Sequence, residues 1–347
     1  MPISEPTPNG ARGVSPRVSV LLPVHNAEST LSSCLRSLAR QREERWECIA
    51  VDDGSSDASA AILRAAAARD ARIKLIRRGH SGIVGALEAG LAHCRAPLVA
   101  RMDADDVMHR DRLAAQCDRL DAEPRLAGVG CRVRIFPRDA LTPGRRAYER
   151  WLNTIACPDD VVKESLVECP IAHPTLVIRR PILEALGYRD VSGPEDYDLI
   201  LRLLGRGHAL AVVPRRLLAW RDHPGRLSRT DPRYALERFT ARKAAHLAEF
   251  VLGEDPEYVL WGYGETGRAL RTALIVHGKR PGSIVELHPR RIGQRIHGAE
   301  VVSPDALRER ARQMIVVSVA GAGPRAQIRA ALREMGYAEP RDFVCTA

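Results

Sequence analysis

Two groups of acidic side chains stand where they could do chemistry. In the first, Asp103, Asp105 and Asp106 follow a short apolar run. On an extended chain Asp103 and Asp105 project to one side, whereas Asp106 points elsewhere. Two carboxylates 4 Å apart repel by about 4 kcal/mol at an effective dielectric constant near 20, and a divalent cation reverses that sign. Mg²⁺ and Mn²⁺ prefer one or two carboxylates together with substrate phosphate oxygens, so the spacing indicates a metal site. A solvated acidic loop that caps the following helix is the alternative.

The second acidic group is Glu195-Asp196, which directly follows Pro194. A carboxylate beside an acceptor hydroxyl can take its proton, and general-base catalysis of this kind contributes about 10²- to 10⁴-fold. We expect Asp196 to be ionised in a partly polar cleft and to act as the base, with Glu195 orienting the loop or the acceptor. The alternative is the first turn of a helix, where acidic side chains favour the macrodipole. Both can hold, because a helix terminus is a rigid mount for a base.

The densest charge on the chain lies between Arg206 and Lys243, where ten basic residues stand against three acidic ones. Within it, His223 could be a manganese ligand, with a structural hydrogen bond as the alternative. Arg226 and Arg229 follow in a predicted loop, where they could meet a phosphate of a donor or of a lipid-linked acceptor. The same basic segment could hold the protein against an anionic membrane surface.

A glycine motif occurs near residue 260. Gly262, Gly264 and Gly267 follow a predicted strand and open a predicted helix, and Glu286 stands 22 residues after Gly264 at the end of the next predicted strand. This is the context of a dinucleotide fingerprint. NAD(P) is therefore one candidate ligand. No acid or base suited to hydride transfer accompanies the motif, so a binding or docking module is favoured over a dehydrogenase, with a scaffold whose site stays empty as the alternative.

The elements that must position these residues alternate along the chain. Apolar runs predict strands, and longer periodic patterns predict helices. The expected strands are 18–22, 48–51, 73–76 and 98–101, and the expected helices are 27–40, 58–69 and 82–93. This alternation predicts an α/β fold with parallel strands, whose ligands bind beyond the carboxyl ends of the strands. The chain is less regular from about residue 120 to residue 250, where we expect a strand at 176–178 and a helix at 197–204.

Composition excludes several classes of protein. Hydrophobic residues are 45% and charged residues 28% of the 347, as in ordinary globular domains. No apolar run reaches the roughly 18 to 20 residues that a membrane span needs, and residues 1–16 lack the apolar region of a signal peptide. The eight cysteines are scattered, which predicts reduced thiols in a cytoplasmic protein. The net charge of +10 would admit nucleic acid, but aromatic residues are only 4% and no nucleic-acid motif is present.

Four segments occur in a fixed order: Val18–Asn26, Val51–Asp57, Arg101–Asp106 and Pro194–Asp198. Together they resemble glycosyltransferase family 2, the inverting nucleotide-sugar transferases of GT-A fold, over about residues 17 to 245. The resemblance implies a mostly parallel, Rossmann-like sheet, a nucleotide-sugar donor (usually a UDP-sugar), Mn²⁺ or Mg²⁺, and an acceptor hydroxyl on a glycan or lipid-linked glycan. We expect a role in building a bacterial surface glycan.

The resemblance also implies roles for individual residues. Asp53 would contact the base, with Pro23 beside it. Asp103 would lie near the ribose and the metal, Asp105 would bind the metal that bridges the diphosphate, and Asp196 would be the catalytic base. These roles agree with the chemistry inferred for the two acidic groups.

Two further residues, His173 and Glu88, bear on the predicted site. His173, in a segment that also resembles the family, is expected to shape the acceptor pocket. Glu88 departs from the family, whose members often carry Asn there. A carboxylate close to the donor diphosphate would oppose binding unless an arginine neutralised it.

The predicted domains follow from these observations. Residues 1–16 are a disordered leader, and 17–250 are the transferase domain, with a nucleotide-sugar half (17–120) and an acceptor half (121–250). Residues 257–347 form a smaller domain that resembles the Rossmann-like modules of sugar-modifying proteins. The alternative function is a catalytically inactive regulatory protein that binds sugar nucleotides.

Overall fold

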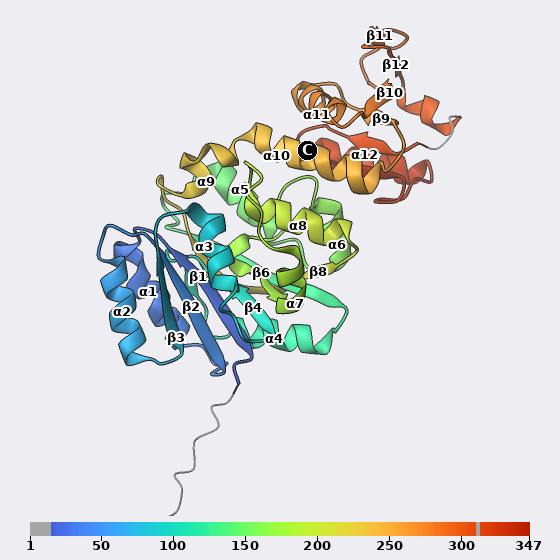
Figure 1. Cartoon of the computed structure of the whole chain (residues 1–347). Coiled ribbons are helices and arrows are strands. Elements are labelled where there is room, and N and C mark those ends of the chain that lie inside the picture. Colours follow the sequence, from blue (N-terminus) through green and yellow to red (C-terminus); the bar gives the residue numbers. More distant parts are fainter. Residues whose placement is uncertain (1–14, 310–312) are drawn as a thin grey trace, which may run out of the picture.

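The computed structural model describes residues 15–309 and 313–347, and two β-sheets organise them (Figure 1). The larger has the order β3-β2-β1-β4-β7-β6-β8-β5. Its neighbours are parallel from β3 through β4 and in the β6/β8 pair, and antiparallel at β4/β7, β6/β7 and β5/β8. Its strands are β1 (Val18–Val24), β2 (Trp46–Asp53), β3 (Ile73–Arg78), β4 (Leu98–Arg101), β5 (Val107–Met108), β6 (Leu126–Phe136), β7 (Val177–Arg179) and β8 (Ala209–Arg221).

Helices cover this sheet and connect its strands. They are α1 (Glu28–Ala39), α2 (Ser59–Arg69), α3 (Gly82–Leu91), α4 (Arg112–Ala122), α5 (Pro143–Leu152), α6 (Pro158–Glu164), α7 (Arg180–Leu186), α8 (Glu195–Gly205), α9 (Leu227–Thr230) and α10 (Leu236–His246). Short helical segments are η1 (His173–Thr175), η2 (Pro232–Tyr234) and η3 (Leu247–Val251). The strands and helices predicted up to residue 101 are confirmed, with ends that differ by at most two residues.

Close packing of α3 on the sheet places the amino end of this helix beside the end of β2. A Cβ atom on Gly90 would lie 2.3 Å from Leu21 Cδ1 and 2.8 Å from Val51 Cγ2, distances that real side chains do not adopt. The absence of a side chain therefore lets α3 approach β1 and β2. This approach brings Gly82, the first residue of α3, within hydrogen-bonding distance of the Asp53 carboxylate.

The smaller sheet has the order β11-β12-β10-β9-β13-β14, with parallel neighbours apart from the β11/β12 pair. Its strands are β9 (Glu257–Trp261), β10 (Arg280–Val285), β11 (Arg295–Ile296), β12 (Ala299–Val302), β13 (Ile315–Val317) and β14 (Phe343–Cys345). The connecting helices are α11 (Glu265–Ile275), η4 (Pro304–Arg308) and α12 (Ala322–Glu334). The first strand of this unit is central and the chain winds outward on both sides of it, as in doubly wound folds.

The two sheets lie in different parts of the molecule, and α10 lies between them (Figure 1). α10 packs against α8 on the side of the larger sheet and against α11 on the side of the smaller one. The predicted domain boundaries remain predictions. Of the predicted leader, residues 1–14 lie outside the described residues.

Two expectations concern the environment of the protein. Within residues 15–309 and 313–347, no helix combines the length and the apolar character that crossing a membrane requires. All eight cysteines fall in this described part, and all are free thiols.

Candidate functional site

One large cavity, of about 1050 Å³, opens at the carboxyl ends of β1, β2 and β4. Loops from both halves of the larger sheet line it. They include all the residues predicted for a transferase site: Pro23, Asp53, Asp103, Asp105, Glu195, Asp196, His223, Arg226 and Arg229. The fold therefore brings together side chains that are up to 206 residues apart in the sequence.

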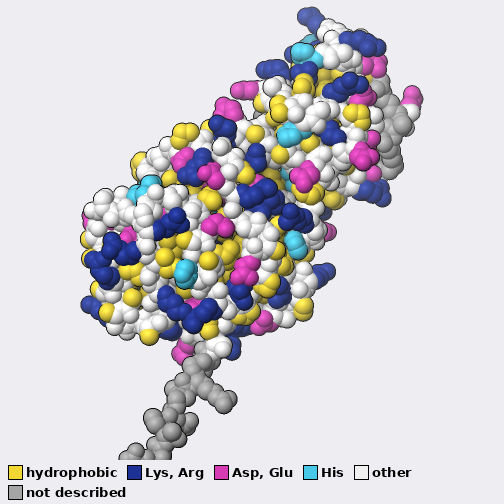
Figure 2. Space-filling model, viewed as in Figure 1, with side chains coloured by type: hydrophobic (Ala, Val, Ile, Leu, Met, Phe, Trp, Pro, Cys, Tyr) yellow, Lys and Arg dark blue, Asp and Glu magenta, His cyan; other side chains and the backbone are white. Residues whose placement is uncertain are grey.

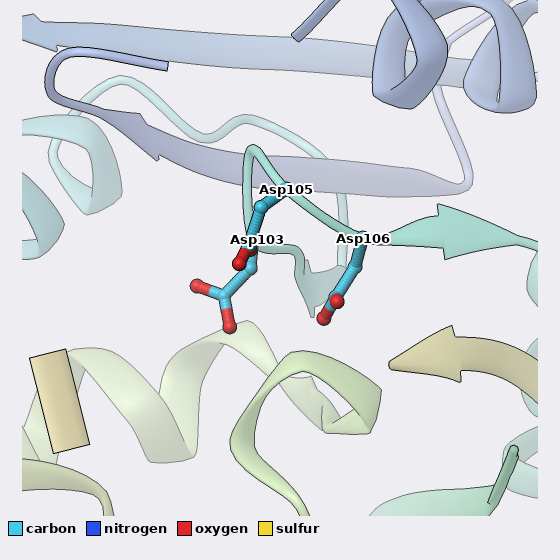
Figure 3. Close-up of side chains that lie close together, drawn as sticks. All are labelled: Asp103, Asp105 and Asp106. Carbon is cyan, nitrogen blue, oxygen red and sulfur yellow. The ribbon is translucent and has the colours of Figure 1, made fainter. Parts of the chain in front are cut away.

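The acidic turn after β4 forms one side of this cavity. Ligand oxygens of Asp103, Asp105 and Asp106 all lie within 4.8 Å of one another (Figure 3). The chain turns after β4, so one Asp106 oxygen lies close to the other two carboxylates, but Asp106 does not line the cavity. Asp106 is fully buried and its Oδ1 accepts a hydrogen bond from the backbone N–H of Arg221 at 2.7 Å. Burial, and next the charges of Asp103 and Asp105, raise its pKa well above the ordinary value.

Asp103 and Asp105 are the carboxylates that reach the cavity, with side chains 29% and 27% exposed. An Arg101 nitrogen lies 2.7 Å from Asp103 Oδ1, and His223 Nε2 lies 3.1 Å from Asp105 Oδ2. Burial raises the pKa of Asp105, and the neighbouring charge of Asp103 raises it further. A hard divalent cation fits this donor set of carboxylate oxygens and one imidazole, because it would replace repulsion between the acids with attraction to both.

The second acidic group begins α8, as its sequence predicted. Pro194 precedes the helix, and Glu195 and Asp196 occupy its first turn. Glu195 is buried, and its Oε2 accepts a hydrogen bond from the Tyr234 hydroxyl at 2.6 Å. His173 Nδ1 lies 3.7 Å from Glu195 Oε1. Burial raises the pKa of Glu195.

Asp196 lies in the wall of the same cavity. Its Oδ1 accepts a hydrogen bond from the Tyr197 backbone N–H at 2.7 Å. Burial, and next the charge of Glu195, raise its pKa to about 7. A carboxylate with this pKa is partly protonated at neutral pH, and it is better matched than an ordinary Asp to removing a proton from a hydroxyl.

Asp53 caps the amino end of α3. Its carboxylate accepts hydrogen bonds from the Ser81 hydroxyl at 2.9 Å, the Ser81 backbone N–H at 3.1 Å and the Gly82 backbone N–H at 2.9 Å. The rings of His25 and His80 lie 4.3 Å apart beside it, and both line the cavity. A base contact by Asp53 stays a prediction, because the carboxylate already has partners in its own chain.

Arg226 and Arg229, which the sequence suggested as phosphate contacts, belong to a cationic cluster built on Trp220, whose third member, Arg145, sequence reasoning missed. The guanidinium groups of Arg145 and Arg226 lie 4.8 and 4.6 Å from the Trp220 ring centre. One buried carboxylate, Asp222, lies 3.5 Å from Arg145 and 3.9 Å from Arg226, and its oxygens accept hydrogen bonds from Arg229 at 2.8 and 2.9 Å. Arg145 Nε and one terminal nitrogen of Arg226 are buried without a hydrogen-bond partner. Three arginines thus share one acid, and the cluster can hold an anion.

Other lining residues escaped prediction because no local pattern marks them. Arg145 and Tyr148 belong to α5, and Glu168 and Cys169 to the segment before η1. Only packing between segments distant in sequence brings these residues to the cavity. Glu88, in contrast, does not line the cavity: its Oε1 accepts a hydrogen bond from the Tyr188 backbone N–H at 2.5 Å. The expectation that this carboxylate stands beside a donor diphosphate is therefore wrong.

The glycine motif lies in the smaller sheet, outside the cavity lining. Gly262 has a φ of +95°, and a Cβ on Gly267 would lie 2.1 Å from the Gly262 carbonyl oxygen. A Cβ on Gly264 would meet nothing within 4 Å, so the loop is open there. Glu286 follows β10, and its Oε1 accepts a hydrogen bond from the Tyr263 backbone N–H at 3.3 Å. The motif therefore forms a tight turn between β9 and α11 that is open at Gly264, and a dinucleotide site there stays a prediction.

Charged side chains of both signs are mixed on one face of the molecule. On the face drawn in Figure 2, Lys and Arg side chains are interspersed with Asp and Glu over both parts of the molecule and form no continuous basic band.

Comparisons with known proteins agree with this geometry. The sequence profile of Glycosyl transferase family 2 matches residues 19–187. Putative glycosyltransferase EpsE of Bacillus subtilis is 30% identical over 198 residues, which cover 55% of this chain and 68% of EpsE. Amylovoran biosynthesis glycosyltransferase AmsE of Erwinia amylovora is 30% identical over 207 residues, covering 58% of this chain and 74% of AmsE.

A likeness in fold extends further along the chain. The structure of S. aureus TarS 1–349 in complex with UDP-GlcNAc aligns with a TM-score of 0.55 at 15% identity, over 74% of this chain and 71% of TarS. The profile match ends at residue 187. Asp196 and the smaller sheet lie beyond it, and so do Arg226 and Arg229 of the cationic cluster.

Proposed function

The chain belongs to glycosyltransferase family 2, and from that premise we propose that it is an inverting, metal-dependent transferase that moves a sugar from a nucleotide-sugar donor to an acceptor hydroxyl. One observation carries the proposal: the Asp103/Asp105 pair and Asp196, which are suited to different steps of one reaction, line the same cavity. TarS, whose fold is similar, was crystallised with UDP-GlcNAc, which supports a UDP-sugar as the donor.

Donor binding would use the acidic turn and the cationic cluster together. Asp103 and Asp105, with His223 beside Asp105, would hold Mn²⁺ or Mg²⁺, which when bound stabilises the negative charge that develops on the leaving diphosphate. Arg226 and Arg229 would bind the phosphates, and we add Arg145 to this set because its buried Nε makes no hydrogen bond and lies 3.5 Å from the shared Asp222 carboxylate. Pro23 and Asp53 would lie beside the base at the ends of β1 and β2.

Transfer would proceed by a single displacement. The acceptor oxygen attacks C1 of the sugar, the bond from C1 to the phosphate oxygen breaks, and the nucleoside diphosphate leaves. Asp196 takes the proton of the acceptor hydroxyl, and attack from the face opposite the leaving group inverts C1. Glu195, which accepts a hydrogen bond from the Tyr234 hydroxyl, would keep the start of α8 in place and maintain the pKa of Asp196.

The acceptor is a glycan or a lipid-linked glycan. AmsE takes part in amylovoran biosynthesis, and this relationship supports bacterial polysaccharide biosynthesis as the setting. Exposed Leu227 and Leu236 stand in the same segment as exposed Arg229 and Arg238. Such a combination favours peripheral contact with an anionic surface, which we place at the cytoplasmic face of the membrane.

The smaller domain would bind a nucleotide. Gly262, Gly264 and Gly267 have the geometry that a pyrophosphate contact needs, and Glu286 stands where it could accept a hydrogen bond from a ribose hydroxyl. Both a dinucleotide such as NAD(P) and a nucleotide sugar contain this pyrophosphate–ribose unit.

The alternative is a regulatory protein that binds sugar nucleotides without turnover. Release of nucleoside diphosphate from UDP- and GDP-hexoses, measured with and without Mn²⁺ in the wild type and in Asp105→Ala, separates the two. A metal-dependent release that Asp105→Ala loses supports the enzyme. Tight donor binding without release or transfer, for any acceptor tried, supports the regulator.

A further inference from the structure

The smaller domain is packed firmly onto the transferase domain. Ala244 and Leu247, at the end of α10, belong to the same continuous buried cluster as Leu270 and Leu274 of α11. Val167, from the segment after α6, packs against the apolar core of the smaller sheet. An apolar contact of this kind keeps the two parts together as one body instead of leaving them to move on a linker.

A buried ion pair at this contact involves Arg329 of α12. One of its terminal nitrogens lies 2.7 Å from Glu164 Oε1 in α6, and the other donates to the Lys163 carbonyl oxygen at 3.0 Å. A second carboxylate of the smaller domain, Glu339, accepts from the same guanidinium at 2.9 Å. The side chains of Arg329 and Glu164 are only 14% and 15% exposed. Breaking one partner of such a pair is costly, because the other stays buried and charged.

Glu164 also contacts Trp151, which packs against a residue of the cavity wall. Its Oε2 accepts a hydrogen bond from Trp151 Nε1 at 2.9 Å. The Trp151 ring packs against Tyr148, with ring centres 5.7 Å apart, and Tyr148 lines the cavity. A second ring that packs against Tyr148 is Trp220, on which the cationic cluster is built, at 6.2 Å between ring centres.

A second contact holds the adjoining segment. Lys243 Nζ donates to the carbonyl oxygens of Val167 at 2.8 Å and of Thr346, in the smaller domain, at 3.0 Å. Val167 is followed directly by Glu168 and Cys169, which line the cavity. Glu164 and Val167, which precede the two lining residues, are thus both tied to the smaller domain.

We propose that Arg329 is a positioning residue for the acceptor: through Glu164 and Trp151, the smaller domain fixes the wall of the cavity that carries Tyr148 and Glu168. This inference rests on the proposed function in assigning that wall, which belongs to the acceptor half of the transferase domain, to acceptor binding. Side chains that contact a substrate keep their geometry only when the next layer of residues holds them, and losses of about 10- to 100-fold are typical when that layer is removed.

The test compares Arg329→Ala with Arg333→Ala in the full chain. Arg333 lies on the same helix, is 58% exposed and lies 4.0 Å from Glu339, so it is a matched control outside the Glu164 contact. Hydrogen exchange is followed over residues 145–170, UDP affinity is measured with Mn²⁺, and transfer from the donor is assayed with p-nitrophenyl hexosides as acceptor probes.

We expect Arg329→Ala to speed exchange about tenfold over residues 148–152 and 164–169 and to raise the KM for the acceptor probe about tenfold, with UDP affinity within twofold of wild type. Trp151→Phe, which keeps the ring but removes the donor to Glu164, should raise the same KM, and the double variant should add little to either single change. Arg333→Ala should match wild type in every readout.

Two results would overturn the inference. One is a folded Arg329→Ala protein with unchanged exchange in both segments. The other is faster exchange with an unchanged acceptor KM, which would mean that Arg329 serves stability alone. If the wild type transfers sugar from no donor to any probe, the proposed function fails, and the exchange comparison between Arg329→Ala and Arg333→Ala still decides whether the smaller domain holds the wall.

Discussion

His223 Nε2 lies 3.1 Å from Asp105 Oδ2, and this contact joins the loop after β8 to the acidic turn after β4. The Nε of Arg221, two residues before His223, donates to the Asp105 carbonyl oxygen at 2.7 Å. The proposed metal-binding part of the site is therefore built by two segments that are more than 100 residues apart. Each can be tested separately.

A change in the acidic turn should abolish the Mn²⁺-dependent activity, whereas a change in the loop after β8 should only weaken Mn²⁺ binding. Asp105→Asn removes the carboxylate charge that a cation needs, so activity with Mn²⁺ should fall at least about 100-fold. His223→Ala should raise the Mn²⁺ concentration for half-maximal activity about tenfold. Initial rates against Mn²⁺ concentration, after treatment with EDTA, measure both effects. Full activity in EDTA would contradict the assignment of Asp103 and Asp105 to a metal.

The pH dependence should report the ionisation of Asp196. A general base works in its unprotonated form, and the pKa of Asp196 is about 7. We expect kcat/KM to fall about tenfold for each pH unit below 7 and to level off above it. The measurement is a pH profile of kcat/KM between pH 5 and 9 at saturating Mn²⁺.

Glu195→Gln distinguishes the roles of the two acids. The charge of Glu195 contributes to the raised pKa of Asp196, so its removal should lower that pKa and move the acidic limb of the profile to lower pH, with activity retained at pH 8. Tyr234→Phe should move the limb in the same direction, because the Tyr234 hydroxyl stabilises ionised Glu195. Loss of activity at every pH in Glu195→Gln would instead identify Glu195 as the base.

The cationic cluster on Trp220 should recognise phosphate. Arg145→Ala removes one guanidinium from the cluster and is expected to weaken UDP binding about 10- to 100-fold, since hydrogen bonds to charged groups contribute about 1.5–3 kcal/mol. Binding of uridine, which lacks phosphate, should change less than twofold. Calorimetry with both ligands measures the difference, and Arg215→Ala, whose partner Asp111 lies outside the cavity lining, is the control. An equal loss for uridine would place Arg145 elsewhere in the site.

Substitutions at two glycines of the smaller domain should affect nucleotide binding and thermal stability differently. A side chain at Gly264 meets no protein atom within 4 Å, so Gly264→Ala should leave the melting temperature unchanged while it obstructs the approach of a pyrophosphate. Gly267→Ala should instead lower the melting temperature, because its Cβ would lie 2.1 Å from the Gly262 carbonyl oxygen. Calorimetry with NAD(H), NADP(H) and nucleotide sugars, on wild type and Gly264→Ala, checks this. Binding to none of them by the wild type would argue for a scaffold alone.

Local patterns predicted the framework well. β1, β2 and β4 are short buried runs followed by polar turns, and parallel strands bring those turns to one edge of the sheet. The start of α8 was predictable for the same kind of reason, because Pro194 and two acids mark a helix terminus. Family resemblance then related Asp53, Asp105 and Asp196 to one site.

What could not be predicted depends on contacts distant in sequence. Tyr234 meets Glu195 across 39 residues, and Arg145 reaches the Trp220 ring from α5. No periodicity or spacing records such pairs. The burial of Asp106 against the Arg221 backbone depends on a contact across 115 residues, and Glu88 caps a backbone N–H because the 187–188 loop packs over α3.

The most direct test of the account is the rate of sugar transfer by Asp196→Asn at saturating donor and Mn²⁺, pH 8, measured alongside its affinity for UDP. Asparagine keeps the size of the side chain and its hydrogen bond at the start of α8 but cannot take a proton. We expect a rate at least about 100-fold below wild type, with UDP affinity within twofold. A variant that transfers sugar at the wild-type rate would contradict it.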